Sequence, residues 1–177
     1  MKKIITALVF VLAACFAIAQ DKQPPGMRME ITEVSENDNN YSVFTYKDDV
    51  GSLGYYLSIG HEYDYIGTEL RHIDEICLFL GITADDTYDS LGFLADFFDN
   101  EAGTTVKFTC RMSTGAEKLS DYTSVSCMVV RHGLQGKRLN FKYQIDNHSI
   151  ETELTQSSLK SLRRGFRAYQ KTHKNKK

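Results

Sequence analysis

Residues 106–112 read Val-Lys-Phe-Thr-Cys-Arg-Met, and this short stretch decides the fold class. Every second side chain is apolar and the ones between are polar. A period of two is typical of a strand with one face buried and one face in water, which is common in antiparallel sheets. We therefore predict an antiparallel strand here, with Val106, Phe108, Cys110 and Met112 facing inward.

Further strands are predicted on both sides of this segment. Downstream, residues 122–131 and 138–145 alternate in the same way, and the glycines of Gly133-Leu134-Gln135-Gly136 predict a turn between them. Upstream, residues 27–34, 41–47 and 54–60 are rich in Tyr, Val, Ile and Phe and are separated by turn-forming Asn, Asp and Gly. The sequence thus predicts about six strands.

Three segments show helical spacing instead. Apolar residues in 68–81 recur every three or four positions, and Gly81 follows as a stop signal. A second helix is predicted at 87–99, and a third is expected to start near Gln156 to Ser158 and to bury Leu159, Leu162, Phe166 and Tyr169. We therefore expect an α+β fold, a mostly antiparallel sheet of about six strands with two or three helices packed on one face.

The first residues predict export. Lys2 and Lys3 precede an apolar run that is too short to span a bilayer, and Ala17-Ile18-Ala19 has the small-x-small pattern of a signal-peptidase site. We expect residues 1–19 to be a bacterial signal peptide that is removed before Gln20, which places the mature protein in the periplasm or outside the cell.

Leu12-Ala13-Ala14-Cys15 supports an alternative, because it resembles a lipobox, in which Cys15 would carry a lipid anchor to the outer membrane. The apolar Phe16 to Ala19 that would follow is unlike the usual polar tether of a lipoprotein, so we favour soluble export. No transmembrane segment is expected in the mature chain.

Domain boundaries follow from length and composition. We expect 20–26 to be a linker, because Pro24-Pro25-Gly26 resists strand pairing. Residues 27–170 suffice for a single α+β domain, and 171–177 form a lysine-rich C-terminal tail.

Charge is distributed unevenly along the chain. The full sequence has a net charge of −2, yet eight basic and no acidic residues follow Thr155. A basic end on an acidic body indicates either docking within the molecule or an anionic partner, although a solvated helix face explains it as well. A nucleic-acid partner is not expected, because the helix lacks an exposed aromatic platform and the protein is predicted to be exported.

Three cysteines remain in the predicted mature chain. Cys110 and Cys127 fall on the inward side of consecutive predicted strands, so they are candidates for a cross-strand disulfide, with simple burial as the equal alternative. Cys77 lies on the apolar side of the predicted helix 68–81, and we interpret it as an inert core residue.

One cluster of possible metal ligands or catalytic groups occurs between His61 and Glu75. It consists of His61, Glu62, Asp64, His72, Asp74 and Glu75. A zinc-protease helix would need a second His four residues after His61, which is absent, and we expect His72 and Glu75 to project into water from a helix. We therefore predict no metal, no cofactor and no catalytic residue, with a small envelope hydrolase using this cluster as an alternative.

Six of the ten tyrosines lie close together in the sequence, and they are the candidate binding residues: Tyr41, Tyr46, Tyr55, Tyr56, Tyr63 and Tyr65. Exposed tyrosines would form a recognition surface for a protein or a glycan, whereas tyrosine is also simply a good strand former. The expectation is an exported, non-enzymatic binding protein of the cell envelope, with an inhibitor or immunity-type protein and a lipid-anchored protein as further alternatives.

Overall fold

The computed structural model describes residues 23–36, 39–66, 69–114, 118–133, 136–145 and 148–174 of the 177-residue chain. Within these ranges, side chains are described except those of 60–74, 114, 145, 148, 150 and 174. The predicted signal peptide, its cleavage site and Cys15 therefore lie outside the described residues, and so do Lys176 and Lys177.

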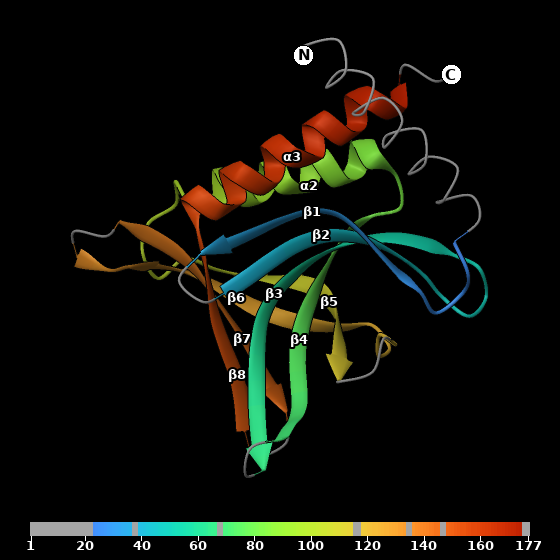
Figure 1. Ribbon diagram of the computed structural model, residues 1–177. Helices are drawn as coiled ribbons and strands as arrows, with labels where there is room; N and C mark the ends of the chain where they lie inside the picture. The colour runs from blue at the N-terminus through green and yellow to red at the C-terminus, as the bar shows by residue number, and fades with distance from the viewer. Residues whose placement is uncertain are drawn as a thin grey trace, which may run out of the picture.

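Eight strands form one antiparallel sheet in which each strand pairs only with its neighbours in the chain (Figure 1). They are β1 (Arg28–Glu36), β2 (Asn39–Lys47), β3 (Leu53–Ile66), β4 (Glu69–Gly81), β5 (Thr105–Thr114), β6 (Thr123–Arg131), β7 (Lys137–Ile145) and β8 (His148–Thr155). The sheet curls strongly, so that β8 comes near β3. Two helices, α2 (Ala84–Phe97) and α3 (Gln156–Lys174), lie side by side across the open side of the curl (Figure 1).

The predicted fold class is wrong in its strand number and in the shape of its sheet. Eight strands form a curled sheet, in place of about six strands with helices on one face. The main error concerns 68–81, which is β4 and not a helix. Glu75, Ile76, Cys77 and Leu78 are all buried, because both faces of β4 are covered. Burial on both sides removes the alternation that marks a strand, and the remaining apolar spacing imitates a helix.

The other predicted elements are present with shifted ends. The strands predicted at 27–34, 41–47, 54–60, 106–112, 122–131 and 138–145 correspond to β1, β2, β3, β5, β6 and β7. The helix α2 begins three residues earlier than predicted, after Thr83, whose side chain accepts a hydrogen bond from the Asp86 amide at 3.1 Å. The strand β8 was not predicted.

The main core fills the inside of the curl. It combines the inward side chains of the strands with those of the two helices, including Leu57, Cys110, Phe141, Leu91 and Phe166. Leu159, Leu162 and Phe166 of α3 are fully buried, as predicted, and the ring of Tyr55 meets that of Phe166 edge-on at 6.0 Å. Each such side chain contributes roughly 1.5–3 kcal/mol by leaving water.

A second, smaller cluster covers the outer face of β2, β3 and β4. It contains Phe44, Tyr46, Tyr56, Cys77 and Leu119, with Phe79 partly buried beside them. Leu119, in the segment just before β6, packs on this face, and Arg111 holds that segment by donating to the backbone carbonyl groups of Leu119, at 3.0 Å, and Ser120. Both faces of the central strands are therefore apolar and covered.

The chain before β1 also packs on this sheet. The Gln23 side chain is 2% exposed, and its amide nitrogen donates to the carbonyl oxygen atoms of Met27 at 2.6 Å and Thr45 at 3.2 Å. Its amide oxygen accepts from the Thr45 hydroxyl group at 3.0 Å. The folded part of the chain thus includes Gln23, inside the segment 20–26 that was expected to be a linker.

A glycine allows α3 to approach β1 closely. A Cβ atom on Gly165 would lie 2.2 Å from Thr32 Oγ1 and 3.0 Å from Thr32 Cβ, which no relaxed structure tolerates. Gly92 of α2 is different, because a Cβ atom there would meet only the end of the flexible Arg163 side chain, at 3.1 Å.

These two glycines give a matched pair of variants. In an ordinary helix interior, Gly→Ala stabilises by about 1 kcal/mol. We expect Gly92→Ala to be neutral or stabilising, since Arg163 can move, and Gly165→Ala to lower the free energy of unfolding by about 2 kcal/mol, because α3 must shift away from β1. Urea unfolding of both variants measures the difference. Equal stability of the two variants would contradict the close approach.

Candidate functional site

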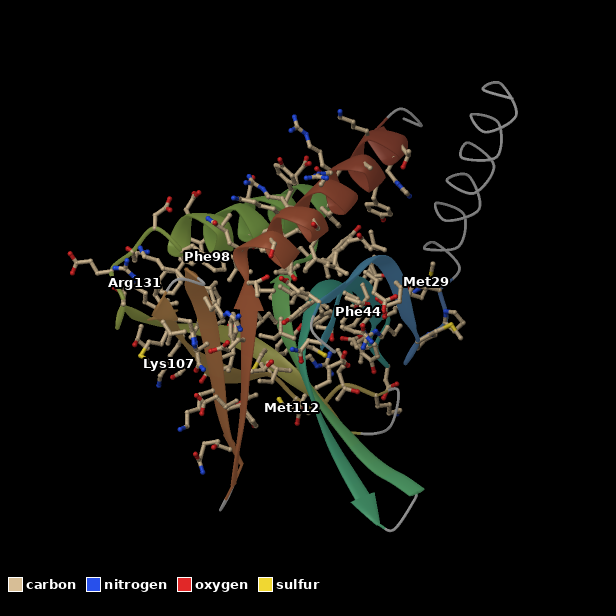
Figure 2. All side chains as sticks on the ribbon, turned by 60° about the vertical axis from the view of Figure 1, so that its left-hand side comes forward. Met29, Phe44, Phe98, Lys107, Met112 and Arg131 are labelled. Carbon is tan, nitrogen blue, oxygen red and sulfur yellow. The ribbon has the colours of Figure 1, made fainter. Side chains whose placement is uncertain are left out.

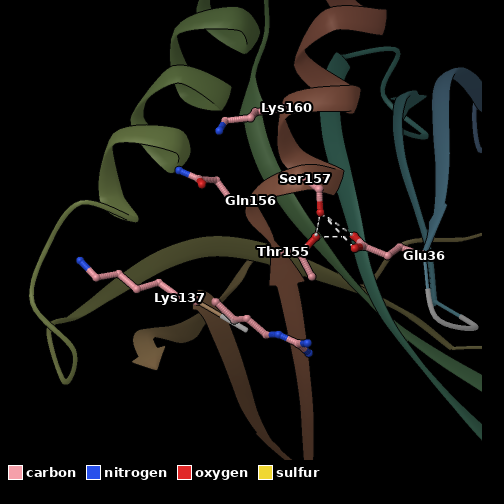
Figure 3. Close-up of a pocket in the computed structure, with 8 residues that line it drawn as sticks. Glu36, Lys137, Thr155, Gln156, Ser157 and Lys160 are labelled. Carbon is pink, nitrogen blue, oxygen red and sulfur yellow. Dashed lines mark hydrogen bonds between the residues drawn. The ribbon is translucent and has the colours of Figure 1, made fainter. Parts of the chain in front are cut away.

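A polar cleft of about 380 Å³ lies where α3 begins (Figure 3). Its walls come from the end of β1, the start of β7, the end of β8 and the first turns of α3, and the lining residues are Glu36, Gly136, Lys137, Arg138, Thr155, Gln156, Ser157 and Lys160. A smaller cavity of about 210 Å³ shares Glu36, Arg138 and Thr155 with it. Because seven of the eight lining residues are polar or charged, the cleft suits a polar or charged group.

The Glu36 carboxylate is bound at the N-terminus of α3. It accepts hydrogen bonds from the hydroxyl groups of Thr155 and Ser157, the Ser157 bond measuring 3.0 Å (Figure 3), and from that of Ser158. Thr155 also caps the helix, since its Oγ1 accepts from the Ser158 amide at 3.1 Å. The hydrogen bonds from Ser158 and Thr155 lower the pKa of Glu36. A carboxylate with a lowered pKa is a weak general base, so this arrangement favours binding over proton transfer.

Basic side chains also line the cleft. Arg138 forms an ion pair of 2.8 Å with Glu153, which also contacts His132 Nε2 at 2.7 Å. Lys137 Nζ donates to the backbone carbonyl oxygen atoms of Asn100, at 2.7 Å, and Asp99, and thereby binds the turn that follows α2. Lys160 is exposed on α3. The cleft therefore presents fixed charges of both signs.

The cleft also joins the two ends of the curled sheet. The buried Tyr41 of β2 donates from its hydroxyl group to the Glu153 carbonyl oxygen of β8 at 2.7 Å. Burial raises the pKa of Tyr41 to about 12, so this donor keeps its proton. The Tyr41–Glu153 hydrogen bond and those of Glu36 together close the sheet around the core.

The Glu36 hydrogen bonds predict a specific pH dependence. A carboxylate with a lowered folded-state pKa stabilises the fold above its unfolded-state pKa, and the contribution is lost as the pH falls through the folded-state pKa. We expect Glu36→Gln to lower the free energy of unfolding at neutral pH, with a difference from wild type that shrinks in acid. Glu33→Gln, at an exposed position of the same strand, is the control and should leave the free energy of unfolding unchanged at neutral and at acid pH. Urea titrations between about pH 7 and about pH 3 test this. A constant difference across this range would refute it.

A second polar cluster is buried under the outer face of the sheet. Glu75 is 5% exposed and pairs with Arg28 at 2.6 Å, while the Ser58 hydroxyl group donates to the same carboxylate. The Arg28 guanidinium also donates to Ser42 Oγ at 2.8 Å and lies 3.8 Å from the centroid of the Phe44 ring. Phe44 is labelled in Figure 2. Burial raises the pKa of the Cys77 thiol, which contacts the same carboxylate at 3.7 Å. Cys77 therefore stays protonated and is not a nucleophile.

This cluster is expected to matter for stability. Removing one partner of a buried ion pair leaves an uncompensated charge and costs about 3–5 kcal/mol. We expect Arg28→Met to destabilise by about 3 kcal/mol and the double variant Arg28→Met/Glu75→Met to cost much less than the two single changes added together. Lys118→Met, which removes the exposed pair with Asp49, is the control and should cost less than about 1 kcal/mol. Urea unfolding measures all four variants, and additive effects of the first two changes would show that the pair is not coupled.

The predicted cluster of ligands lies in strands. Backbone pairing places His61 opposite Glu75, Glu62 opposite Asp74 and Asp64 opposite His72 in the β3–β4 hairpin. The side chains of residues 60–74 are outside the described set, so only Glu75 is placed, and it is buried and not directed into water as predicted. The error follows from assigning this segment to a helix.

Four of the candidate tyrosines are core residues. Tyr41, Tyr46, Tyr55 and Tyr56 are each at most 6% exposed, so they do not present an exposed contact face. Tyr46 and Tyr56 belong to the outer cluster and Tyr41 and Tyr55 to the main core. The side chains of Tyr63 and Tyr65 are outside the described set. The strand-forming interpretation accounts for the four that are placed.

The predicted cysteine geometry is correct in part. Cys110 and Cys127 are buried in the main core on the adjacent antiparallel strands β5 and β6. However, Cys110 pairs with Thr123, and Cys127 pairs with Val106, four residues along the strand from Cys110. That offset corresponds to about 13 Å, beyond the reach of a disulfide. Both thiols are free, as is Cys77, and burial explains them.

The sequence interpretation missed the cleft. Glu36 and Thr155 are 119 positions apart, and only the curl of the sheet brings them together.

Among the described residues, no group of three or more His, Cys, Asp or Glu side chains could hold a metal ion, and no helix is long and apolar enough to cross a membrane.

No family model, curated protein or solved structure matches the chain.

Proposed function

We propose that the protein is an exported, non-enzymatic binding protein of the bacterial cell envelope, and that the outer surface of α2 and α3 is its contact face. The N-terminal signal sequence supports export, with cleavage before Gln20 or, alternatively, lipidation at Cys15. The surface over the helices supports protein binding.

The helix α3 exposes one row of basic side chains. Lys160, Arg164, Arg167 and Lys171 are all exposed and are spaced by four, three and four residues, which places them on one helix face. Arg163, which lies between Lys160 and Arg164 in the sequence, does not belong to this row. Instead it packs between the helices, with its guanidinium over the Tyr88 ring, 4.7 Å from the centroid.

The helix α2 exposes a row of acidic side chains. Asp85, Asp89 and Asp96 are exposed, at spacings of four and seven residues that also correspond to one helix face. This helix lies beside α3 in Figure 1. The surface over the helices therefore consists of an acidic row next to a basic row.

The two helices run antiparallel, which fixes the level of each charge. Near the start of α2, the Ala84 carbonyl oxygen accepts from the Gln170 side chain at 2.8 Å, while Arg163 lies over Tyr88 one to two turns further along. These contacts place Asp89 near the level of Arg164 and Arg167, and Asp96 near the level of Lys160.

The observation that carries the proposal is that six charges in these rows are unneutralised. Asp89, Asp96, Arg164 and Arg167 form no ion pair within 4.0 Å among the residues that the structure describes, and the same holds for Lys160 and Lys171. Adjacent rows of both signs match a protein surface better than a uniformly anionic polymer, because such a polymer would be repelled by the acidic row. The polar cleft at the start of α3 extends the basic row at Lys160.

Photo-crosslinking in the exporting bacterium tests the contact face. Arg164 is replaced by a benzophenone-bearing phenylalanine in the full chain, and Lys107 is replaced likewise as the control. Lys107 is exposed on β5, on the side of the sheet away from the helices (Figure 2). We expect an adduct of defined mass from position 164 only, and its loss when Lys160 and Arg167 are both changed to Glu. Equal adducts from both positions, or none from position 164, would reject this contact face.

A further inference from the structure

We propose that the partner for the surface over α2 and α3 is a second copy of this chain, bound about a two-fold axis parallel to the helices. This inference rests on the proposed function, because it names the partner for the same face. Its basis is that the acidic row and the basic row lie side by side at matching levels.

The positions of the two rows determine which symmetry axis brings opposite charges together. A two-fold axis that lies in the plane of contact and runs along the seam between the helices exchanges the two sides of that seam. It therefore brings α2 of one copy over α3 of the other and keeps every residue at its own level along the axis. In an isologous contact of this kind, each interaction occurs twice, once on each side of the axis.

The charges then match across the contact. Asp89 of one copy meets the Arg164 and Arg167 region of the other, and Asp96 meets the region of Lys160. Within one chain, the same rows form no ion pair among Asp89, Asp96, Lys160, Arg164, Arg167 and Lys171, although the structure describes all six. Any other rotation that stacks α2 on α2 would bring acidic groups together. Complementarity therefore selects a single axis direction.

The size of the face indicates a weak and salt-sensitive dimer. The 14 residues of α2 rise about 21 Å, and two helices side by side span about 20 Å, so each copy would bury about 400 Å². This is about half of a standard interface, and its charges are exposed to screening. We expect association in the micromolar to millimolar range at low salt and its loss at about 0.5 M salt.

A charge-swap mixture tests the inference directly, by sedimentation equilibrium of the mature protein. Asp89→Lys alone and Arg164→Glu alone should each weaken self-association by at least about tenfold, because each variant places like charges opposite one another twice. An equimolar mixture of the two variants should associate again, since the introduced lysine of one chain would then face the introduced glutamate of the other and the native pair would remain on the opposite side. Pairing within one chain cannot give this recovery, because each chain carries only one change. Lys107→Glu is the control and should leave association unchanged.

Several outcomes would overturn the dimer. A wild-type protein that stays monomeric at about 1 mM in low salt has no such contact. If neither Asp89→Lys nor Arg164→Glu weakens self-association, the dimer uses another face. If the mixture of the two variants does not associate again, the two copies are related by another axis. Circular dichroism of each variant confirms that it is folded. The salt dependence of wild-type self-association tests the charged contact without any substitution. A crosslinked adduct from position 164 whose mass is not twice that of the chain would retain the contact face and reject the second copy as its occupant.

Discussion

The whole structure depends on one constraint, that the central strands are covered on both faces. A sheet of eight strands in chain order has a large apolar inner face, and it can bury that face only by curling and by receiving helices across its open side. The second cluster, around Phe44, Tyr56 and Cys77, then covers the outer face of β2 to β4. Buried charges are tolerated there because Arg28 and Glu75 neutralise one another and further hydrogen bonds reach both groups.

The closure of the curl and the polar cleft have a common origin. When the sheet curls, the end of β1 reaches the start of α3, and Glu36 takes the position at which a helix N-terminus favours a negative charge. Tyr41 joins β2 to β8 in the same region. The cleft therefore arises where distant segments meet, and its fixed charges belong to a rigid frame.

The sequence predicts the half-buried strands and the last helix well, because their periodicity reflects one apolar and one wet face. It fails for β4, where Ile76 and Leu78 face one cluster and Cys77 faces the other, so that no alternation remains. It fails for the cleft as well, because Glu36 and Ser158 are joined only through the curl. The register of Cys110 and Cys127 is set by backbone pairing that composition does not encode. The basic row on α3 could be inferred from the sequence, whereas the acidic row beside it depends on how α2 lies.

The docking of Gln23 on β2 bears on the order of events during maturation. With cleavage before Gln20 as proposed, only three residues separate the cleaved bond from the anchored Gln23 side chain. Even fully extended, three residues span about 10 Å, which leaves a membrane-bound peptidase little room beside a folded domain. Removal of the signal peptide would then have to precede the docking of this segment, so that proteolysis and the docking of Gln23 would occur in a fixed order.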